Sequence, residues 1–156
     1  MATAAEPRKL IAENRKARHD YHVLEVFETG VVLLGTEVKA IREGRVNLRD
    51  SYARLDKGEM WLLNVHISPY SHRGYADHPE KRQRKLLLHR HEIQKLTGKV
   101  AEKGLTLVPL EMYFKDGRVK LALALAKGKH EYDKRETIRR REVDRETRAA
   151  VKARQR

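Results

Sequence analysis

Basic side chains gather in three parts of the sequence, and the chemistry they offer is the binding of anions. One group runs from Arg15 to Arg18, a second from Lys81 to Lys85, and a third spreads over residues 127–156. The whole chain holds 35 Lys and Arg against 22 Asp and Glu, which gives a net charge of +13. A Lys or Arg set against a phosphate releases condensed counterions, so this excess favours a nucleic acid as the partner. An acidic membrane surface would require an amphipathic helix with a broad apolar face, and the sequence shows none.

Histidines could bind a metal ion, but their spacing argues against it. The closest pairs are His19 with His22 and His89 with His91. The second pair lies two residues apart in a predicted helix, which would place the two rings on different faces. The chain has no cysteine, so a structural zinc site would lack its commonest ligands. We therefore predict no metal site and no cofactor.

Carboxylates near arginines offer an enzymatic alternative, in which Glu37, Glu43 or Asp50 would act as the base of a small nuclease. Cleavage of a phosphodiester by that route requires clustered carboxylates that hold a metal ion. These three residues are instead scattered among Lys and Arg, as on a charged helix face. A glycine-rich phosphate loop and a nucleophile elbow are both missing from the sequence. We expect a binding protein and not an enzyme.

Cysteine content and hydropathy indicate the compartment. Without cysteine, nothing ties the fold to an oxidising environment. The start of the chain, Met1 to Pro7, has no apolar signal core, and no run approaches the roughly 20 apolar residues that span a bilayer. These features predict a cytoplasmic protein with no membrane partner.

Turn signals between apolar runs predict the elements that position the basic groups. Residues 1–10 have too little apolar periodicity to predict structure, and we expect them to be loose. Apolar runs around a Thr-Gly turn predict a hairpin over residues 21–34, and Asp56 to Glu59 predicts a second over residues 52–63. A third hairpin is predicted over residues 105–126, with its turn at Lys115 to Arg118.

Two helices are predicted between the hairpins. A short helix begins at Gly35 and ends near Gly44, and a longer amphipathic helix covers residues 86–103 and ends at Gly104. Hairpins with helices between them are typical of a closed or partly closed antiparallel barrel. The predicted fold is therefore mainly β with peripheral helices, an OB-like barrel over residues 11–126.

The last 30 residues, 127–156, differ in composition from the rest of the chain. They hold 12 Lys and Arg against 6 Asp and Glu, and their few large apolar side chains form no helical stripe. The residue types nevertheless favour helix. We predict a basic tail that is disordered in the free protein and becomes helical when it binds RNA.

Seven short motifs, in order and with similar spacing from about residue 11 onward, resemble the SmpB family of SsrA-binding proteins. They are NRKARHDY at 14–21, GTEVK at 35–39, DSY at 50–52, ISPY at 67–70, RKLLL at 84–88, KGK at 127–129 and DKR at 133–135. The resemblance implies an OB-fold barrel that binds the tRNA-like part of transfer-messenger RNA. It also implies a tail that enters the vacant decoding site of a stalled ribosome and begins trans-translation, without catalysis.

The expected RNA-binding residues combine this resemblance with side-chain chemistry. Asn14, Glu28 and Leu87 match family positions on the RNA-facing surface, although a solvated carboxylate or a core leucine would explain the last two equally well. Phosphate-binding chemistry adds basic residues of the first two groups. The predicted RNA-binding set is Asn14, Arg15, Lys16, Arg18, His19, Glu28, Lys85 and Leu87.

In the tail, the resemblance assigns Asp133, Lys134 and Arg135 to the ribosomal decoding centre. Tyr132 precedes them and could stack on a base of ribosomal RNA. The expected partners are thus transfer-messenger RNA and the ribosome, with the protein itself a monomer. A basic ribosomal protein and a generic OB-fold RNA binder remain as alternatives.

Overall fold

Nine strands and four helices make up the described part of the chain, which is residues 8–69, 78–102, 104–129 and 131–154 of a computed structural model. The strands are β1 (Arg8–Glu13), β2 (Tyr21–Val31), β3 (Val46–Asn47), β4 (Tyr52–Asp56), β5 (Glu59–Leu63), β6 (His66–Ile67), β7 (Arg84–Leu87), β8 (Leu105–Lys115) and β9 (Arg118–Gly128). The helices are α1 (Arg15–Asp20), α2 (Gly35–Arg42), α3 (Arg90–Val100) and α4 (Glu131–Arg154).

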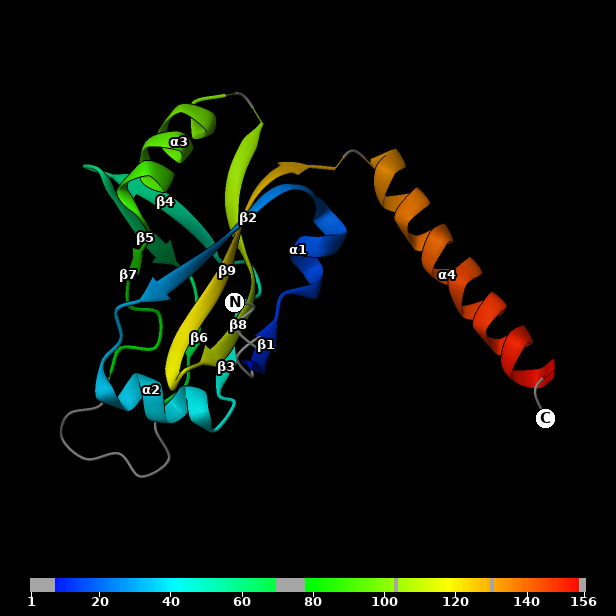
Figure 1. Ribbon diagram of the computed structural model, residues 1–156, viewed down its shortest axis with the longest axis horizontal. Coiled ribbons are helices and arrows are strands. Elements are labelled where there is room, and N and C mark those ends of the chain that lie inside the picture. The colour runs from blue at the N-terminus through cyan, green and yellow to red at the C-terminus, as the bar shows by residue number, and fades with distance from the viewer. Residues whose placement is uncertain (1–7, 70–77, 103, 130, 155–156) are drawn as a thin grey trace, which may run out of the picture.

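Six of the described strands close into a barrel (Figure 1). In order around the barrel they are β8, β4, β5, β7, β2 and β9, and β9 pairs back with β8, each pair being antiparallel. Strand β8 divides one edge between two partners: Leu107 pairs with Ala53 of β4, whereas residues 111–115 pair with β1. The predicted mainly β fold with peripheral helices is confirmed, and the barrel is OB-like.

Alternating apolar side chains fill the barrel. Leu121, Leu123 and Leu125 of β9 point inward and are buried. Ile41 of α2 and Leu96 of α3 belong to the same core, and Figure 1 shows these two helices at opposite ends of the barrel. Burial of each such side chain stabilises the fold by about 1.5–3 kcal/mol relative to exposure.

A second apolar cluster fixes α1 to the outside of β8 and β9. The alanines between the inward leucines, Ala122, Ala124 and Ala126, face this outer layer, where Ala17 of α1 and Val108 of β8 join them. Such small side chains let a helix lie close to the strands. The position of α1, and of the basic residues on it, is therefore set by the barrel wall.

Two of the predicted hairpins are confirmed. The turn between β4 and β5 has Lys57 and Gly58 at φ angles of 50° and 76°, and the turn between β8 and β9 has Asp116 and Gly117 at 53° and 69°. Positive φ at both central residues is what a two-residue turn between twisted strands requires. The predicted short helix is also confirmed as α2, and Gly44 beyond its end has a φ of 76°.

The predicted hairpin over residues 21–34 is wrong. Strand β2 runs without a break from Tyr21 to Val31 and pairs with β9 over most of its length. Gly30 lies within the strand, where a Cβ atom would approach the Cβ of Leu87 to 3.3 Å. The close approach of β7 therefore accounts for this glycine, and no turn is formed there.

Two other local predictions are corrected, and one segment for which no structure was predicted is a helix. Residues 8–10 were expected to be loose but belong to β1, because they pair with the far end of β8; residues 1–7 lie outside the described part. The basic segment after Asn14 is the helix α1. Leu86 and Leu87 are not helical: they lie in β7 between its partners β5 and β2, and α3 begins only at Arg90.

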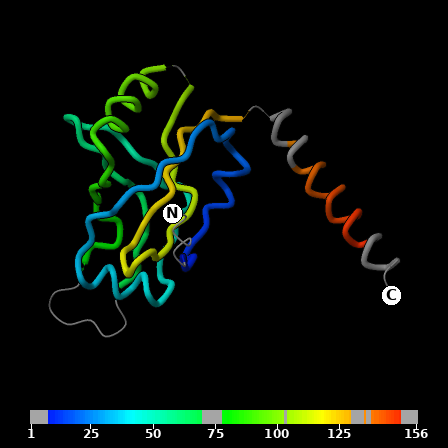
Figure 2. The backbone as a smooth tube through the Cα atoms, viewed as in Figure 1, coloured from blue at the N-terminus to red at the C-terminus, as the bar shows by residue number. Residues whose placement is uncertain are grey.

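Helix α4 lies apart from the barrel and approaches it beside α1 (Figures 1 and 2). Its described side chains are exposed, including Ile138 and Val143. The helical conformation agrees with the residue types; disorder of this segment in the free protein stays a prediction. None of the helices in the described ranges is long and apolar enough to cross a membrane.

Candidate nucleic-acid interface

Asn14 joins α1 to the barrel from a buried position. Its Oδ1 accepts a hydrogen bond from the backbone N–H of Ala17 at 3.1 Å, which caps the helix. Its Nδ2 donates to the carbonyls of Pro109 at 2.9 Å and Leu48 at 3.1 Å. Asn14 is only 4% exposed, although it lines a pocket beside α1. It orients the helix that carries the basic residues, and its predicted contact with RNA stays a prediction.

The basic side chains of α1 face solvent. Arg15 is 88% exposed on its side chain and lies 3.9 Å from Glu13, whereas Lys16 forms a 2.5 Å ion pair with Asp50. Arg18 lies 3.7 Å from Glu13, and His19 contacts the carboxylate of Asp20 at 2.9 Å. Exposed pairs of this kind are weak and exchange readily for phosphate.

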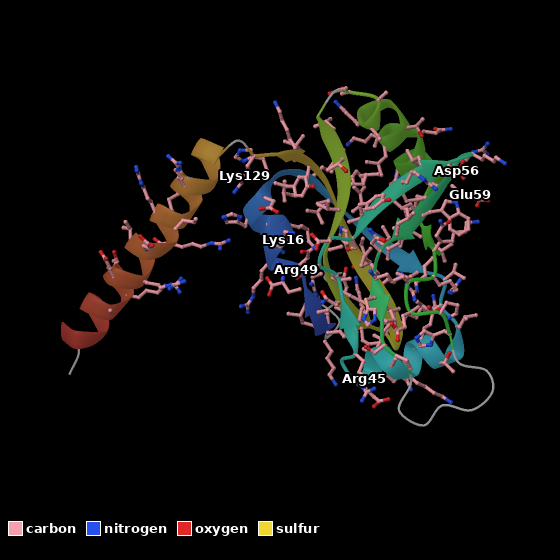
Figure 3. The ribbon with its side chains drawn as sticks, turned by 180° about the vertical axis from the view of Figure 1, so that it is seen from behind. Lys16, Arg45, Arg49, Asp56, Glu59 and Lys129 are labelled. Atoms are coloured by element: carbon pink, nitrogen blue, oxygen red, sulfur yellow. The ribbon has the colours of Figure 1, made fainter. Side chains whose placement is uncertain are left out.

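The flank beside α1 collects further positive charge. Lys129 reaches this helix, because its backbone N–H donates to the carbonyl of Asp20 at 2.8 Å. Figure 3 shows Lys16, Arg49 and Lys129 along one side of the barrel, and Asp56 and Glu59 of the β4–β5 turn at the opposite side. The separation of charge gives this flank the character of an anion-binding surface.

Glu28 lies on β2 in a network of charged and aromatic side chains. The hydroxyl of Tyr113 donates to it, and Lys115 donates to it at 3.3 Å. The Tyr113 bond, aided by Lys115, holds the pKa of Glu28 below its ordinary value, although partial burial acts the other way. Burial and the bond to Glu28 raise the pKa of Tyr113. Glu28 is thus an ionised strand residue that orients Lys115, and it does not lie in a turn.

Leu87 and Lys85 lie on the outer side of β7. Leu86 is buried in the core, while Leu87 next to it is 52% exposed, so Leu87 is not a core residue. Its register partner is Gly30, two residues beyond Glu28 on the same face of β2. Lys85 forms an ion pair with Glu59 at 3.5 Å.

A family model described as SmpB protein matches residues 11–153, which is nearly the whole chain. The chain belongs to the SmpB family. The SsrA-binding protein of Syntrophobacter fumaroxidans is 60% identical over 144 residues, covering 92% of this chain and 89% of the relative. That of Carboxydothermus hydrogenoformans is 60% identical over 146 residues, covering 94% and 98%.

A solved structure of the SmpB family superposes on this one. It is described by the words "tmRNA-SmpB: a journey to the center of the bacterial ribosome". Its chain is 50% identical and superposes with a TM-score of 0.66, covering 83% of this chain and 94% of the solved one. The predicted resemblance to the SmpB family is therefore confirmed.

The candidate residues of this SmpB-family chain form two groups along β2. Arg15, Lys16 and Arg18 lie on α1, which precedes the first residue of β2, Tyr21. Glu28 pairs with Ala122 of β9, which pairs with Glu111 of β8, and Arg18 lies 4.0 Å from Glu111. Arg8 pairs with Glu111 and lies over the ring of Tyr113, whose hydroxyl donates to Glu28. A chain of side-chain contacts across β8 therefore connects the two groups.

In the second basic group, Lys81 to Lys85, two arginines pair with a buried carboxylate, which was not predicted from the sequence. Arg84 is fully buried, and its Nε donates to Glu37 at 2.6 Å. Arg82 donates to the other oxygen of Glu37 at 2.6 Å. Burial alone would raise the pKa of Glu37, but the bonds from Arg82 and the Leu34 N–H and the charge of Arg84 lower it. The only sequence signal for this pair was the position of Arg84, which lies two positions before the inward Leu86 in β7 and so on the same face.

Neither a metal cluster nor a shared carboxylate site forms among the described residues, since no three His, Asp or Glu side chains converge. The expectation for His89 and His91 was wrong in one respect. Their rings stack with centroids 5.5 Å apart, because His89 precedes the helix and is not part of it. Glu37 is tied to its two arginines and so has no free oxygen to act as a base.

The tail residues named from the sequence are only partly described. The side chains of Tyr132, Asp133 and Lys134 lie outside the described residues. Arg135 is exposed on α4. Their assignment to the decoding centre stays a prediction.

Proposed function

We propose that this chain binds the tRNA-like part of transfer-messenger RNA and delivers it to stalled ribosomes, where trans-translation begins. One observation carries the proposal: relatives that are 60% identical over more than nine-tenths of the chain bear the name SsrA-binding protein. The solved chain whose description names tmRNA and the bacterial ribosome supports it. The net charge of +13 supports a polyanionic partner.

The first contact region is α1. Arg15 and Arg18 bind phosphates, and Lys16 exchanges its exposed partner Asp50 for the RNA backbone. His19 follows Arg18 in the last turn of α1. Asn14 holds the helix in place from below, so its contribution to RNA binding is one of positioning.

The second contact region surrounds Glu28 and Leu87. Glu28 cannot bind phosphate, but it orients Lys115 toward RNA or accepts hydrogen bonds from base or ribose donors. Leu87 offers an exposed apolar side chain against a base, and Lys85 on the same strand contributes charge. The two regions are connected through Glu111 and Tyr113 of β8, and such an extended surface suits a folded RNA better than a short single strand.

The tail acts on the ribosome. The tail was expected to begin at residue 127, but residues 127 and 128 pair with β2 at the end of β9. The segment beyond Lys129 enters the vacant decoding site and mRNA channel, with Asp133, Lys134 and Arg135 at the decoding centre and Tyr132 stacked on a base. Since the tail offers no apolar stripe, it orders fully only against ribosomal RNA. Residues 11–126 are the RNA-binding unit. Of residues 1–10, only residues 8–10 contribute to it, as the first part of strand β1.

The proposed role is binding and delivery, without a chemical step by this chain. It places the protein in the cytoplasm, as a monomer bound to one RNA. The rival is a basic ribosomal protein, which would also carry a basic extension.

Ultraviolet cross-linking of the full chain in cells, followed by sequencing of the attached RNA, tests the proposal. Transfer-messenger RNA should dominate, with cross-links at its tRNA-like part. A protein that instead stays on all ribosomal particles in high salt, with cross-links only to ribosomal RNA, would be a ribosomal protein.

A further inference from the structure

Two pockets share Asp50 as a lining residue, and they extend the proposed contact region on α1, since Lys16 also lines the first of them. The first has a volume of about 270 Å³ and lies between α1 and the start of β4. The second, of about 310 Å³, lies beside the β3–β6 pair. Asp50 lines both, so the two pockets adjoin on the flank that Figure 3 marks by Lys16 and Arg49; together they are called the depression.

The first pocket suits a flat aromatic group. Tyr52 is 38% exposed in its wall, and Val108 and Ala17 line it as apolar residues. Its rim is polar and carries the carboxylates of Asp20 and Asp50. Carboxylates accept hydrogen bonds from base N–H groups but repel phosphate. At the lower limit of ordinary ligand pockets, which begin at about 300 Å³, it admits a single small ring system.

The second pocket suits a phosphate. Arg49 and Lys81 line it, with the side-chain amides of Asn47 and Asn64 between them. Among the described residues Lys81 has no ion pair, and Arg49 has only Asp50 at 4.0 Å. The Oδ1 of Asn47 accepts from the Arg49 N–H at 2.9 Å and so fixes the backbone beneath this cation.

The backbone at the junction has an uncommon conformation. Asp50 and Asn64 have φ angles of 60° and 64°, in the left-handed region that side chains other than glycine seldom occupy. Asp50 is also held by the ion pair with Lys16, and that bond lowers its pKa. An ionised carboxylate thus stands between the apolar pocket and the cationic one.

We propose that this depression binds one unpaired nucleotide of the RNA, with its base against Tyr52 and its phosphate against Arg49 and Lys81. The inference rests on the proposed function for the identity of the RNA. It adds a third contact, one that reads an unstacked base, to the two regions described above. The orientation follows from the balance of charge: Asp20 and Asp50 outnumber Lys16 in the first pocket, whereas Arg49 and Lys81 outnumber Asp50 in the second.

Binding of the full chain to the isolated tRNA-like part of transfer-messenger RNA tests this site. Tyr52→Ala should weaken binding by about fivefold to a hundredfold, the usual range for loss of one stacked base, whereas Tyr52→Phe should bind almost as the parent does. Arg49→Gln should weaken binding and flatten its salt dependence. Lys57→Gln, which removes the same charge at the β4–β5 turn, should do neither.

An abasic scan over the unpaired nucleotides identifies the bound base. At one position, loss of the base should weaken binding to the parent chain and have no further effect on Tyr52→Ala. If Tyr52→Ala does not fold, Tyr52→Leu keeps apolar bulk without the ring and serves in the same comparison. Unchanged affinity of these variants, or additive losses at every abasic position, would overturn the site while leaving the proposed function intact.

Two further results separate the hypotheses. A parent chain that does not bind this RNA at all would overturn both the function and the site. Variants that bind the RNA normally but fail on ribosomes would show that the depression faces a ribosomal component, which contradicts the inference.

Discussion

Asn14 illustrates how a polar residue within a motif proposed to contact RNA can act from inside the protein. It satisfies the N-terminus of α1 and two carbonyls of the neighbouring loop and strand with a single amide. An amide does this because it donates and accepts at once. The placement of Arg15, Lys16 and Arg18 thus depends on a buried side chain.

Asn14→Asp should therefore destabilise the protein by about 1–3 kcal/mol. The carboxylate keeps the acceptor for Ala17 but loses both donors, and it faces the carbonyls of Leu48 and Pro109. Urea unfolding measures the change. Asn47→Asp is the control, since Asn47 is exposed and uses only its oxygen. Equal stability of the two variants would show that the buried donors contribute nothing.

The ionisation of Glu37 makes the stability of the fold depend on pH in the acid range. Its pKa is lowered in the folded protein, so its pairing with Arg82 and Arg84 contributes fully above the unfolded value of about 4.5. That contribution is lost as the pH falls through the lower, folded value. Breaking a buried pair by removing one charge costs about 3–5 kcal/mol.

Glu37→Gln should consequently lose stability at pH 7 but lose less on further acidification than the parent chain does. Unfolding free energies measured between pH 7 and pH 3 would show the two curves converging toward acid. Parallel curves would mean that Glu37 does not titrate between these limits, and the pair would then have another role.

At the scale of elements, α1 presents its cations as a unit. Replacing Arg15 and Arg18 together by Ala should flatten the slope of log affinity against log salt by roughly 1 to 2, at about 0.7 to 0.9 per phosphate contact. Arg54 and Lys57 of the β4–β5 hairpin provide a control with the same loss of charge. A slope that changes equally in both double variants would place the RNA surface elsewhere.

The start of α4 carries the charged motif proposed for the decoding centre. Changing Asp133, Lys134 and Arg135 together to Ala should leave affinity for transfer-messenger RNA nearly intact and abolish peptide tagging on stalled ribosomes. Both are measured on one variant. Asp144, Arg145 and Arg148 have the same charges further along the helix, and their replacement should affect tagging less. Tagging that survives in the first variant would contradict a role in decoding.

Local signals predicted the elements whose contacts are local. The Lys57-Gly58 and Asp116-Gly117 turns were evident because few residues other than glycine, Asn or Asp favour positive φ. The turn predicted at Gly30 was wrong, because this glycine accommodates Leu87, which lies 57 positions away along the chain. Likewise the inward position of Arg84 depends on Glu37 of another element, and no window of sequence shows such a pairing. Of the proposed RNA-binding residues, Asn14, Glu28 and Leu87 came from the family resemblance and the others from phosphate-binding chemistry.

At the scale of the whole molecule, barrel and tail divide the proposed work. A chain truncated after Lys129 retains α1, Glu28 and the depression around Asp50, and should bind the tRNA-like RNA within about tenfold of the full chain, or about 1.4 kcal/mol. Titration of both chains with the same RNA at one salt concentration measures this. A larger loss would make the tail a principal part of the RNA interface.

Barrel closure by β8 has a consequence for how the chain reaches its native state. Strand β8 joins β1 and β4, both from the first 56 residues, to β9, which ends at Gly128. Pairings between such distant positions carry a large loop-closure entropy, and domains dominated by them fold over milliseconds to seconds, slower than helical bundles. During synthesis the first strands must therefore wait, with their inner apolar faces uncovered, until about residue 128 has left the ribosome. A protein proposed to rescue stalled ribosomes is itself among those whose unfinished chains cannot fold.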